Sequence, residues 1–350
     1  KDGCVAVALS WLALCIFGAI PFVVSGYIPH PIDALFETVS GFTTTGSSIL
    51  SDVEVLPHCI LIWRSFTHWI GGMGVLVFLL SLLPLAGGYH MNLMKAESPG
   101  PSVSKLVPKV QSTAKILYTI YFGMTLIQLA LLLIGRVPLF DSLCITFGTA
   151  GTGGFGIVND SLGSYSTYCQ VVTTIFMILF GVNFSAYYLI LTKKFRQAFK
   201  YEEVRYYFGI IAVAIVIIAL NTAHLFRNLL TAFQQAAFQV GSIITTTGFS
   251  STDFNQWPAL SKTVLVLLMF VGACAGSTGG GLKCGRVVLL LKNLRRNTRR
   301  VLNPHRVEVV RVNGRRISED VLENTNTYLV AYVVITLVSF LLVSIDGLSL

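Results

Sequence analysis

Residues 33–47 read DALFETVSGFTTTGS, residues 141–155 read DSLCITFGTAGTGGF, and residues 235–249 read QAAFQVGSIITTTGF. The three stretches align without gaps at offsets of 108 and 202 residues. In each, a helix-compatible segment leads into a turn of Thr and Gly, and Gly46, Gly154 and Gly248 occupy the same slot. An internal repeat at a wide spacing is a strong sequence signal of a repeated architecture. The pattern predicts a pore loop that is used several times around one axis, and therefore an ion pathway.

The composition is that of an integral membrane protein. Of the 350 residues, 54% are hydrophobic and 12% are charged, whereas a soluble domain has about 25% charged residues. So apolar a chain is not expected to bind nucleic acid, despite its net charge of +9. The seven cysteines have no metal-ligand spacing, and we expect small buried apolar residues, neither disulfides nor metal ligands. Nothing in the sequence predicts an enzyme.

Seven apolar stretches approach or exceed the length of about 20 residues that a membrane-spanning helix needs. They are residues 4–25, 58–86, 115–135, 169–192, 206–226, 260–292 and 327–345. The short segments 33–42, 141–150 and 235–244 cannot cross, and we expect them to be re-entrant helices. Irregular backbone at membrane depth is tolerated only where protein or water surrounds it. The Thr/Gly turns should therefore meet around a water-filled axis.

The expected fold is an all-α integral membrane protein. Units of span, re-entrant pore helix, filter loop and span are repeated around a pseudo-fourfold pore axis. The expected domains are pore repeats at 4–90, 115–200 and 205–292, a cytoplasmic linker at 91–114, a basic cytoplasmic linker at 293–326, and the start of a truncated fourth repeat at 327–350. The last expectation arises because Asp346-x-Leu348 matches Asp33-x-Leu35, which suggests a fragment of a longer protein. Valines around Asn313-Gly314 predict a small hairpin.

Charge gives the orientation. Twenty of the 25 Lys and Arg residues lie in segments 90–116, 193–205 and 283–316, and the positive-inside rule places these segments in the cytoplasm. The Thr/Gly turns then open to the outside. The outer segments hold acidic residues that either raise the local cation concentration or reflect ordinary loop polarity, and both interpretations stay open. These residues are Asp33, Glu37, Asp52, Glu54, Asp141, Asp160, Asp253 and Asp346.

Arg64 lies within a predicted span, and charged residues there are candidates for function. We expect it to extend outward to the membrane surface rather than to lie by the pore. For His58, His68 and His224 we expect local packing or hydrogen bonding, since none has a partner at metal-ligand spacing.

The Thr/Gly turns have the chemistry that a dehydrated cation needs. A ring of backbone carbonyls can replace the hydration shell, Gly reaches dihedrals that are closed to other residues, and Thr hydroxyls can add ligands or hold the loop. The negative end of each short helix would face the axis. Potassium is the first expectation, because it loses water more readily than sodium. The candidate potassium-binding residues are Thr43, Thr44, Thr45, Gly46, Ser47, Gly151, Thr152, Gly153, Gly154, Phe155, Thr245, Thr246, Thr247, Gly248 and Phe249.

A second candidate site interrupts the span 260–292. Its residues are Gly272, Gly276, Ser277, Thr278, Gly279, Gly280, Gly281 and Lys283. Each Gly in a helix interior costs roughly 1 kcal/mol, so the helix should break and leave a polar loop that could close the path under the filter. Lys283 could repel a passing cation or pair with an acid. Close helix packing through small residues and a plain kink are the alternatives.

Residues 33–46 resemble the first pore loop of the TrkH/KtrB family of bacterial potassium-uptake proteins. His68-WIGGMG-Val75, Pro108-KVQSTAKIL-Tyr118 and Gly276-STGGGLK-Cys284 resemble the same family. The resemblance covers essentially the whole chain and favours TrkH over KtrB. It implies four units around one ion path, a gate at the glycine loop, a homodimer, and a cytoplasmic nucleotide-binding regulatory subunit of the RCK type. The chain departs from the pattern by lacking a fourth filter, the closing span and the extra leading helices.

The resemblance makes the expected function potassium-selective translocation across the bacterial inner membrane, by the pore-forming subunit of a Trk-type uptake system. Potassium is the transported ion, and no organic cofactor is expected. The basic run 286–316 would contact either anionic lipids of the bilayer or the regulatory subunit. A sodium-passing relative of the same fold, a non-transporting membrane scaffold and the pore subunit of an ATP-driven pump stay open as alternatives. Channel-like and ion-coupled transport are not distinguished.

Overall fold

The computed structural model describes residues 2–74, 110–303 and 308–345, and their regular structure is almost entirely helical. Three units follow one another, each with an outer helix, a short helix, a Thr/Gly loop and a second helix. The helices of the first unit are α1 (Asp2–Val24), α2 (Pro31–Phe42) and α3 (His58–Gly72). Those of the second are α6 (Val110–Ile134), α7 (Leu139–Ala150) and α8 (Thr167–Phe180). Those of the third are α11 (Glu202–Thr222), α12 (Leu229–Ile244) and α13 (Ala259–Val271).

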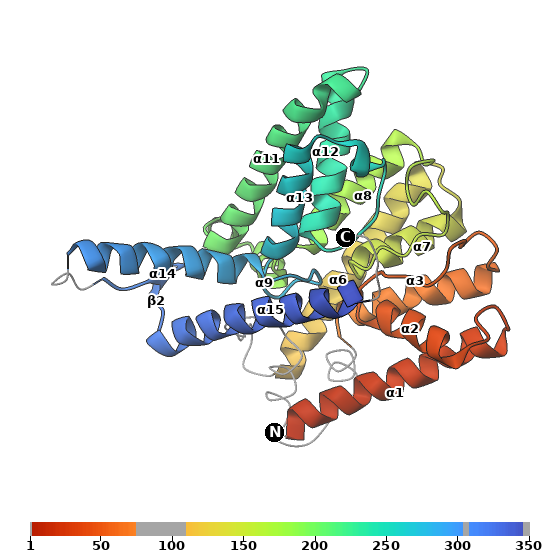
Figure 1. Ribbon diagram of the computed structural model, residues 1–350, viewed down its shortest axis with the longest axis horizontal. Helices are drawn as coiled ribbons and strands as arrows, with labels where there is room; N and C mark the ends of the chain where they lie inside the picture. The colour runs from red at the N-terminus through yellow and green to blue at the C-terminus, as the bar shows by residue number, and fades with distance from the viewer. Residues whose placement is uncertain (1, 75–109, 304–307, 346–350) are drawn as a thin grey trace.

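The same packing recurs from one unit to the next. Each short helix contacts the outer helix and the second helix of its own unit. In addition, α3 packs against α7 of the next unit, and α8 packs against α12 of the next. Figure 1 shows the units following one another in this order, from red through green to teal. This recurrence is the packing expected of units related by rotation about a common axis.

The short helices begin and end for local reasons. Pro31 occupies the first turn of α2, where its missing N–H is not needed. Asn228 caps α12 by accepting a hydrogen bond from Thr231 N at 2.8 Å. The three helices contain 12, 12 and 16 residues, or about 18–24 Å at a rise of 1.5 Å per residue. They therefore cannot cross a hydrocarbon core of about 30 Å, and each delivers its loop inside the fold.

The outer helices present apolar side chains outward. Within the described residues, four helices are long and apolar enough to span a membrane, or five spans if one bent pair counts as one. Their windows are Val7–Val24, Ala114–Ile134, Glu202–Leu225 and Glu319–Ile345. Phe17, Leu220 and Leu341 are 69%, 60% and 64% exposed. Soluble monomers rarely expose so continuous an apolar surface, so this surface is suited to lipid, as in a multi-pass membrane protein.

Two expected spans are broken. The prediction of one helix over 169–192 is wrong, because α8 and α9 (Phe184–Leu191) meet at 94°. Helix α8 ends at Phe180 with Gly181 as its C-cap, and Asn183 caps α9 by accepting a bond from Ser185 N at 2.8 Å. The expected break in 260–292 is confirmed, since α13 stops at Val271 and α14 (Cys284–Leu302) begins after an irregular loop. Of the expected span 58–86, α3 covers 58–72, and residues 75–86 lie outside the described residues.

The basic segments contain more helix than the sequence indicates. Helix α14 extends into the segment expected to be a linker at 293–326, and α15 (Glu319–Ile345) begins within it. The two run side by side in Figure 1. The predicted hairpin is confirmed as β1 (Arg311–Val312) and β2 (Arg315–Arg316), with positive φ at Asn313 and Gly314.

The remaining elements are α10 (Phe195–Phe199) and the 3-10 turns η1 (Ala223–Leu225) and η2 (Phe254–Gln256). Helix α6 begins at Val110, earlier than expected, and the rest of the expected linker, residues 91–109, lies outside the described residues. So does the expected start of a fourth short helix at Asp346.

Candidate functional site

The three Thr/Gly loops share one backbone conformation. Thr44, Thr152 and Thr246 have φ values of 55°, 54° and 58°. Gly46, Gly154 and Gly248, two residues later, have φ values of 80°, 78° and 87°. Positive φ is uncommon for a threonine, so its occurrence at the same slot three times shows that the aligned sequences build the same turn.

Each loop is also tied to its short helix by the same hydrogen bond. Thr45 N, Gly153 N and Thr247 N each donate to the carbonyl five residues earlier at 2.9 Å. The loop therefore continues directly from the carboxyl end of the helix, where the macrodipole is negative. A cation at the loops would lie close to three such ends.

The loops meet one another through glycine. A Cβ atom on Gly46 would lie 2.0 Å from the carbonyl oxygen of Gly153. A Cβ atom on Gly154 would lie 1.9 Å from the carbonyl oxygen of Thr247. Loop 1 (residues 43–47) thus contacts loop 2 (151–155), which contacts loop 3 (245–249). No described atom lies within 4 Å of a Cβ position on Gly248. The contacts bring carbonyls of successive loops together, as a ring of cation ligands requires.

The threonine hydroxyls of loops 1 and 3 hold the loops. Thr43 and Thr45 bond to each other through their Oγ1 atoms at 2.8 Å, and Thr245 and Thr247 do so at 2.7 Å. Thr43 Oγ1 also contacts Val39 O at 2.7 Å. Loop 2 has glycine at both equivalent positions, Gly151 and Gly153.

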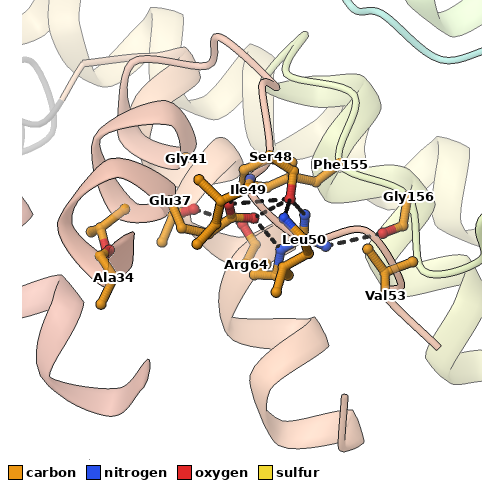
Figure 2. A network of polar contacts seen from close by, with 12 residues as sticks. Ala34, Glu37, Gly41, Ser48, Ile49, Leu50, Val53, Arg64, Phe155 and Gly156 are labelled. Carbon is orange, nitrogen blue, oxygen red and sulfur yellow. Dashed lines mark hydrogen bonds and ion pairs between the residues drawn. The ribbon is translucent and has the colours of Figure 1, made fainter. Parts of the chain in front are cut away.

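Arg64 does not extend to the membrane surface, so that prediction is wrong. Its side chain is 2% exposed, and Nε donates to Oε1 of the fully buried Glu37 at 2.7 Å. Figure 2 shows the guanidinium between the first loop and the second. It donates to Ser48 Oγ at 3.3 Å and to Gly156 O at 3.2 Å, and it lies 4.0 Å from the centre of the Phe155 ring. The buried ion pair holds the arginine inward.

Glu37 completes this network and is fully buried, so its carboxylate is not exposed to solvent. Its carboxylate accepts from Ser48 Oγ at 3.0 and 3.1 Å and from Ile49 N at 3.1 Å. These donors belong to the segment that follows loop 1, so the pair fastens that segment to α2 and α3. The network thus contacts the segment that follows loop 1 and, through Phe155 and Gly156, the end of the second Thr/Gly loop.

The outer segments of the first two units are joined at Asn159. Its side chain donates to Asp52 Oδ1 at 2.9 Å and accepts from Val53 N at 3.0 Å, and its own N–H donates to Glu54 at 3.0 Å. The bond from Asn159 lowers the pKa of Asp52 below its ordinary value. This bond therefore favours the ionised form of Asp52.

A cavity of about 850 Å³ is lined by residues of loops 1 and 3 and of the interrupted span. Its lining includes Thr44 and Thr246 from the loops, and Gly276, Gly280 and Lys283 from the segment after α13. The structure thus brings the two sets of candidate residues, the filter and the glycine loop, to one cavity.

The glycine loop (residues 272–283) folds back on itself under loop 3. Ala273 N donates to Gly280 O at 3.3 Å, and Gly272 and Gly281 have φ values of 70° and 81°. Gly280 N donates to Thr246 Oγ1 at 2.6 Å. The glycine loop therefore contacts the third filter loop directly.

Two bonds fix the glycine loop to the bend between α8 and α9. Cys274 N donates to Gly181 O, and Phe184 N donates to Gly276 O, each at 3.0 Å. Lys283 is 3% exposed, and its Nζ donates to Gly279 O. The lysine side chain thus folds back onto the loop.

Sequence reasoning missed Glu203. This residue is 7% exposed at the start of α11, and its Oε1 accepts from Ala275 N at 2.6 Å and from Gly285 N at 2.9 Å. One carboxylate oxygen therefore joins the glycine loop, at Ala275, to the first turn of α14, at Gly285. Acidic residues in the first turn of a helix are ordinary, so the sequence carries no signal that distinguishes Glu203 from its neighbour Glu202.

The comparisons with known proteins agree with one another. The model of the family TrkH, described as cation transport protein, matches residues 1–347. The Trk system potassium uptake protein TrkH of Salmonella typhimurium is 34% identical over 355 residues, which cover 100% of this chain and 74% of the relative. TrkG of Escherichia coli strain K12 is 30% identical, with 100% and 73% covered. The crystal structure of the potassium transporter TrkH from Vibrio parahaemolyticus matches with a TM-score of 0.88 and 29% identity, covering 99% of this chain and 73% of that one.

Replacing Arg64 with Met should strongly destabilise the protein, because Glu37 would keep a buried charge without its partner. Removing one member of a buried pair costs about 3–5 kcal/mol. The measurement is thermal unfolding of the purified protein in detergent. The double variant Arg64→Met/Glu37→Gln should recover part of the loss, and Arg227→Met, at an exposed arginine, is the control. Equal unfolding temperatures for Arg64→Met and the control would contradict the role of the pair.

Proposed function

The chain belongs to the TrkH family of cation transport proteins, and from this premise we propose that it is the pore-forming subunit of a Trk-type potassium uptake system. The family consists of transporters, so the chain is not an enzyme. The observation that carries the proposal is the threefold recurrence of one loop conformation, together with a cavity that residues of loops 1 and 3 line jointly with the glycine loop. The names of the TrkH and TrkG relatives support potassium as the ion.

In the proposed path, potassium enters from outside and passes the three filter loops. The candidate ligands are the loop residues 43–47, 151–155 and 245–249, whose carbonyls replace the hydration shell. The threonine hydroxyls of positions 43, 45, 245 and 247 hold the loops, since they already bond to each other. The repeats that carry the loops are 4–90, 115–200 and 205–292, with 327–350 beginning a fourth around a pseudo-fourfold axis.

The glycine loop is the proposed gate. It lies at the cavity beneath the filter, and Glu203 holds it from one side while Thr246 contacts it from the other. Lys283 adds a cationic group beside the path. Movement of the loop would open the cavity, and a partner acting on α11 or α14 could produce that movement, because both helices adjoin the Glu203 contacts.

The same proposal includes the membrane location of the protein and its protein partners. The protein resides in the bacterial inner membrane, with filter loops outside and basic segments in the cytoplasm. It forms a homodimer and binds an RCK-type nucleotide-binding subunit. Helix α14 and the hairpin β1–β2 are the candidate contact for that subunit, since Arg299 and Arg311 lie there.

Growth rescue tests the function directly. The full-length protein would be expressed in bacteria that lack potassium uptake, on low-potassium medium, with and without a nucleotide-binding partner subunit. Rescue is expected. A membrane-inserted protein that fails to rescue with the partner present would contradict potassium uptake and favour a sodium-passing relative or a scaffold. Thermal stabilisation by sodium separates these two, because a sodium-passing relative binds that ion and a scaffold has no reason to.

Gly248→Ser should weaken the preference for potassium over sodium, because a side chain at φ 87° strains the loop. Gly154→Ser should weaken it further, because its Cβ would also collide with Thr247 O. The measurement is the potassium-to-sodium uptake ratio in proteoliposomes. Gly209→Ser, on α11 with no atom within 4 Å of its Cβ position, is the control. Ratios unchanged in both filter variants would remove the filter assignment.

Glu203→Ala should raise potassium flux and weaken regulation, because Ala275 N of the glycine loop and Gly285 N at the start of α14 lose their shared acceptor. Loss of such a bond costs about 1–3 kcal/mol, or roughly a factor of 10 in the open fraction. The matched control is Glu202→Ala, since Glu202 pairs with Lys292 on the partly exposed side. Equal flux in the two variants would argue against a role of Glu203 in holding the gate closed.

Deleting Gly279–Gly281 should raise flux still more, because it removes the part of the loop that contacts loop 3 and Lys283. Flux measured in the same vesicles checks this. A deletion variant that inserts, binds potassium and keeps normal regulated flux would exclude the loop as the gate.

A further inference from the structure

The second filter loop lacks the hydroxyl pair that holds the other two. Loops 1 and 3 each have two threonines bonded through their hydroxyls. The equivalent residues of loop 2 are Gly151 and Gly153, yet Thr152 and Gly154 keep the same dihedrals as their counterparts. Thr152 Oγ1 donates to Gly151 O at 2.6 Å, but no side chain of loop 2 links its first residue to its third as the threonine pairs of the other loops do.

The imidazole of His68, which projects from α3 of the preceding unit, occupies that space. A Cβ atom on Gly153 would lie 2.3 Å from Cγ and Nδ1 and 2.5 Å from Cδ2 of the His68 ring. Gly153 does not have a positive φ, unlike Gly154. Its backbone therefore does not require glycine, whereas the ring leaves no room for a side chain.

The ring also makes two directed hydrogen bonds. His68 Nδ1 lies 2.7 Å from Gly41 O, and Phe155 N donates to Nε2 at 3.2 Å. A carbonyl can only accept and a backbone N–H can only donate, so the ring is neutral with its proton on Nδ1. Gly41 is two residues before loop 1, and Phe155 ends loop 2. One fully buried ring thus sets the spacing between the two loops.

The next unit provides an internal comparison. Gly72 of α3 and Gly181 after α8 approach the first residue of the following loop, with Cβ positions 2.6 Å from Gly151 Cα and 2.8 Å from Thr245 Cγ2. Likewise, Tyr121 and Tyr207 donate to Trp69 O and Ile178 O. Gly72 therefore corresponds to Gly181, and Trp69 corresponds to Ile178. His68 directly precedes Trp69 and Met177 directly precedes Ile178, so Met177 is the counterpart of His68.

Met177 is fully buried in the apolar cluster that contains Phe249 of loop 3. Beside the loop that has its own threonine pair, the second helix therefore carries an apolar side chain. Beside loop 2, which has glycines in place of that pair, α3 carries His68, whose neutral ring has one hydrogen-bond donor and one acceptor. The helix residue and the loop residues complement each other.

We propose that His68 is a selectivity-determining positioning residue, which holds the second filter loop in place of the threonine pair that holds the other two. The inference rests on the proposed function, and it deepens that function by making one loop depend on the preceding unit. Because the His68 ring fills the space that a side chain at position 153 would need, a larger residue at position 153 should be tolerated only when His68 is replaced as well.

The test is a double-variant cycle in the full-length protein, with His68→Met, Gly153→Thr and the combination, which rebuilds loop 2 on the plan of loop 3. Two readouts are used: the potassium-to-sodium uptake ratio in proteoliposomes and the midpoint of thermal unfolding in detergent. His68→Met should lower the ratio about tenfold, the effect expected when a buried donor loses its acceptor. Gly153→Thr should lower both readouts more, and the combination should exceed Gly153→Thr alone in both.

Two further variants test whether His68 acts through its hydrogen bonds or only through the volume of its side chain. His68→Gln places an amide oxygen near the former Nε2, so it should keep a ratio closer to wild type than His68→Met does. His224→Met, at an exposed histidine, should change neither readout. A wild-type protein without potassium uptake would overturn the proposed function. A potassium-selective wild type whose ratio survives His68→Met, or a combination no better than Gly153→Thr, would overturn the role of His68 alone.

Discussion

The structure depends on one constraint, which is that backbone polar groups at membrane depth must find partners within the protein. Helices meet this constraint by themselves, whereas the filter loops and the glycine loop do not. The groups that hold these loops are few and buried. Phe155 N bonds to His68, Ile49 N bonds to Glu37, and Ala275 N and Gly285 N bond to Glu203. Glu37 comes from the short helix just before loop 1, whereas His68 and Glu203 come from elements distant in sequence. The bonds to His68 and Glu203 therefore connect helices of different units as well as holding the loops.

Buried charge in this fold serves the same purpose. The Arg64–Glu37 pair costs desolvation, and its own attraction offsets that cost only with good geometry and further hydrogen bonds. Ser48, Ile49 and Gly156 supply those bonds. An apolar pair could fill the volume, but it could not satisfy the backbone groups of two loops at once. The ion pair is therefore understood as a device for loop geometry.

The three loops share a conformation but not the means of holding it. Loops 1 and 3 use internal hydroxyl pairs, and loop 2 uses an imidazole from the preceding unit. Repeated loops can therefore keep the same backbone conformation while different side chains hold each of them. The direct bond from Gly280 N to Thr246 Oγ1 adds a second asymmetry, since it connects the third loop to the glycine loop. A change at the glycine loop would thus reach the filter through one hydrogen bond.

The sequence by itself determined the repeat, the short helices, the Thr/Gly turns and the break at the glycines, because all of these follow from local periodicity and from what Gly permits. It also predicted the hairpin at Asn313-Gly314. The bend at Gly181–Asn183 was not predictable, because an unbroken apolar run does not reveal a helix that ends to receive another loop. Arg64 was predicted to face outward, because its partner Glu37 lies 27 residues away and the span alone offers it no acid. Only the tertiary structure decided the roles of Arg64, His68 and Glu203, since each acts on backbone groups that folding, and not sequence spacing, brings within reach.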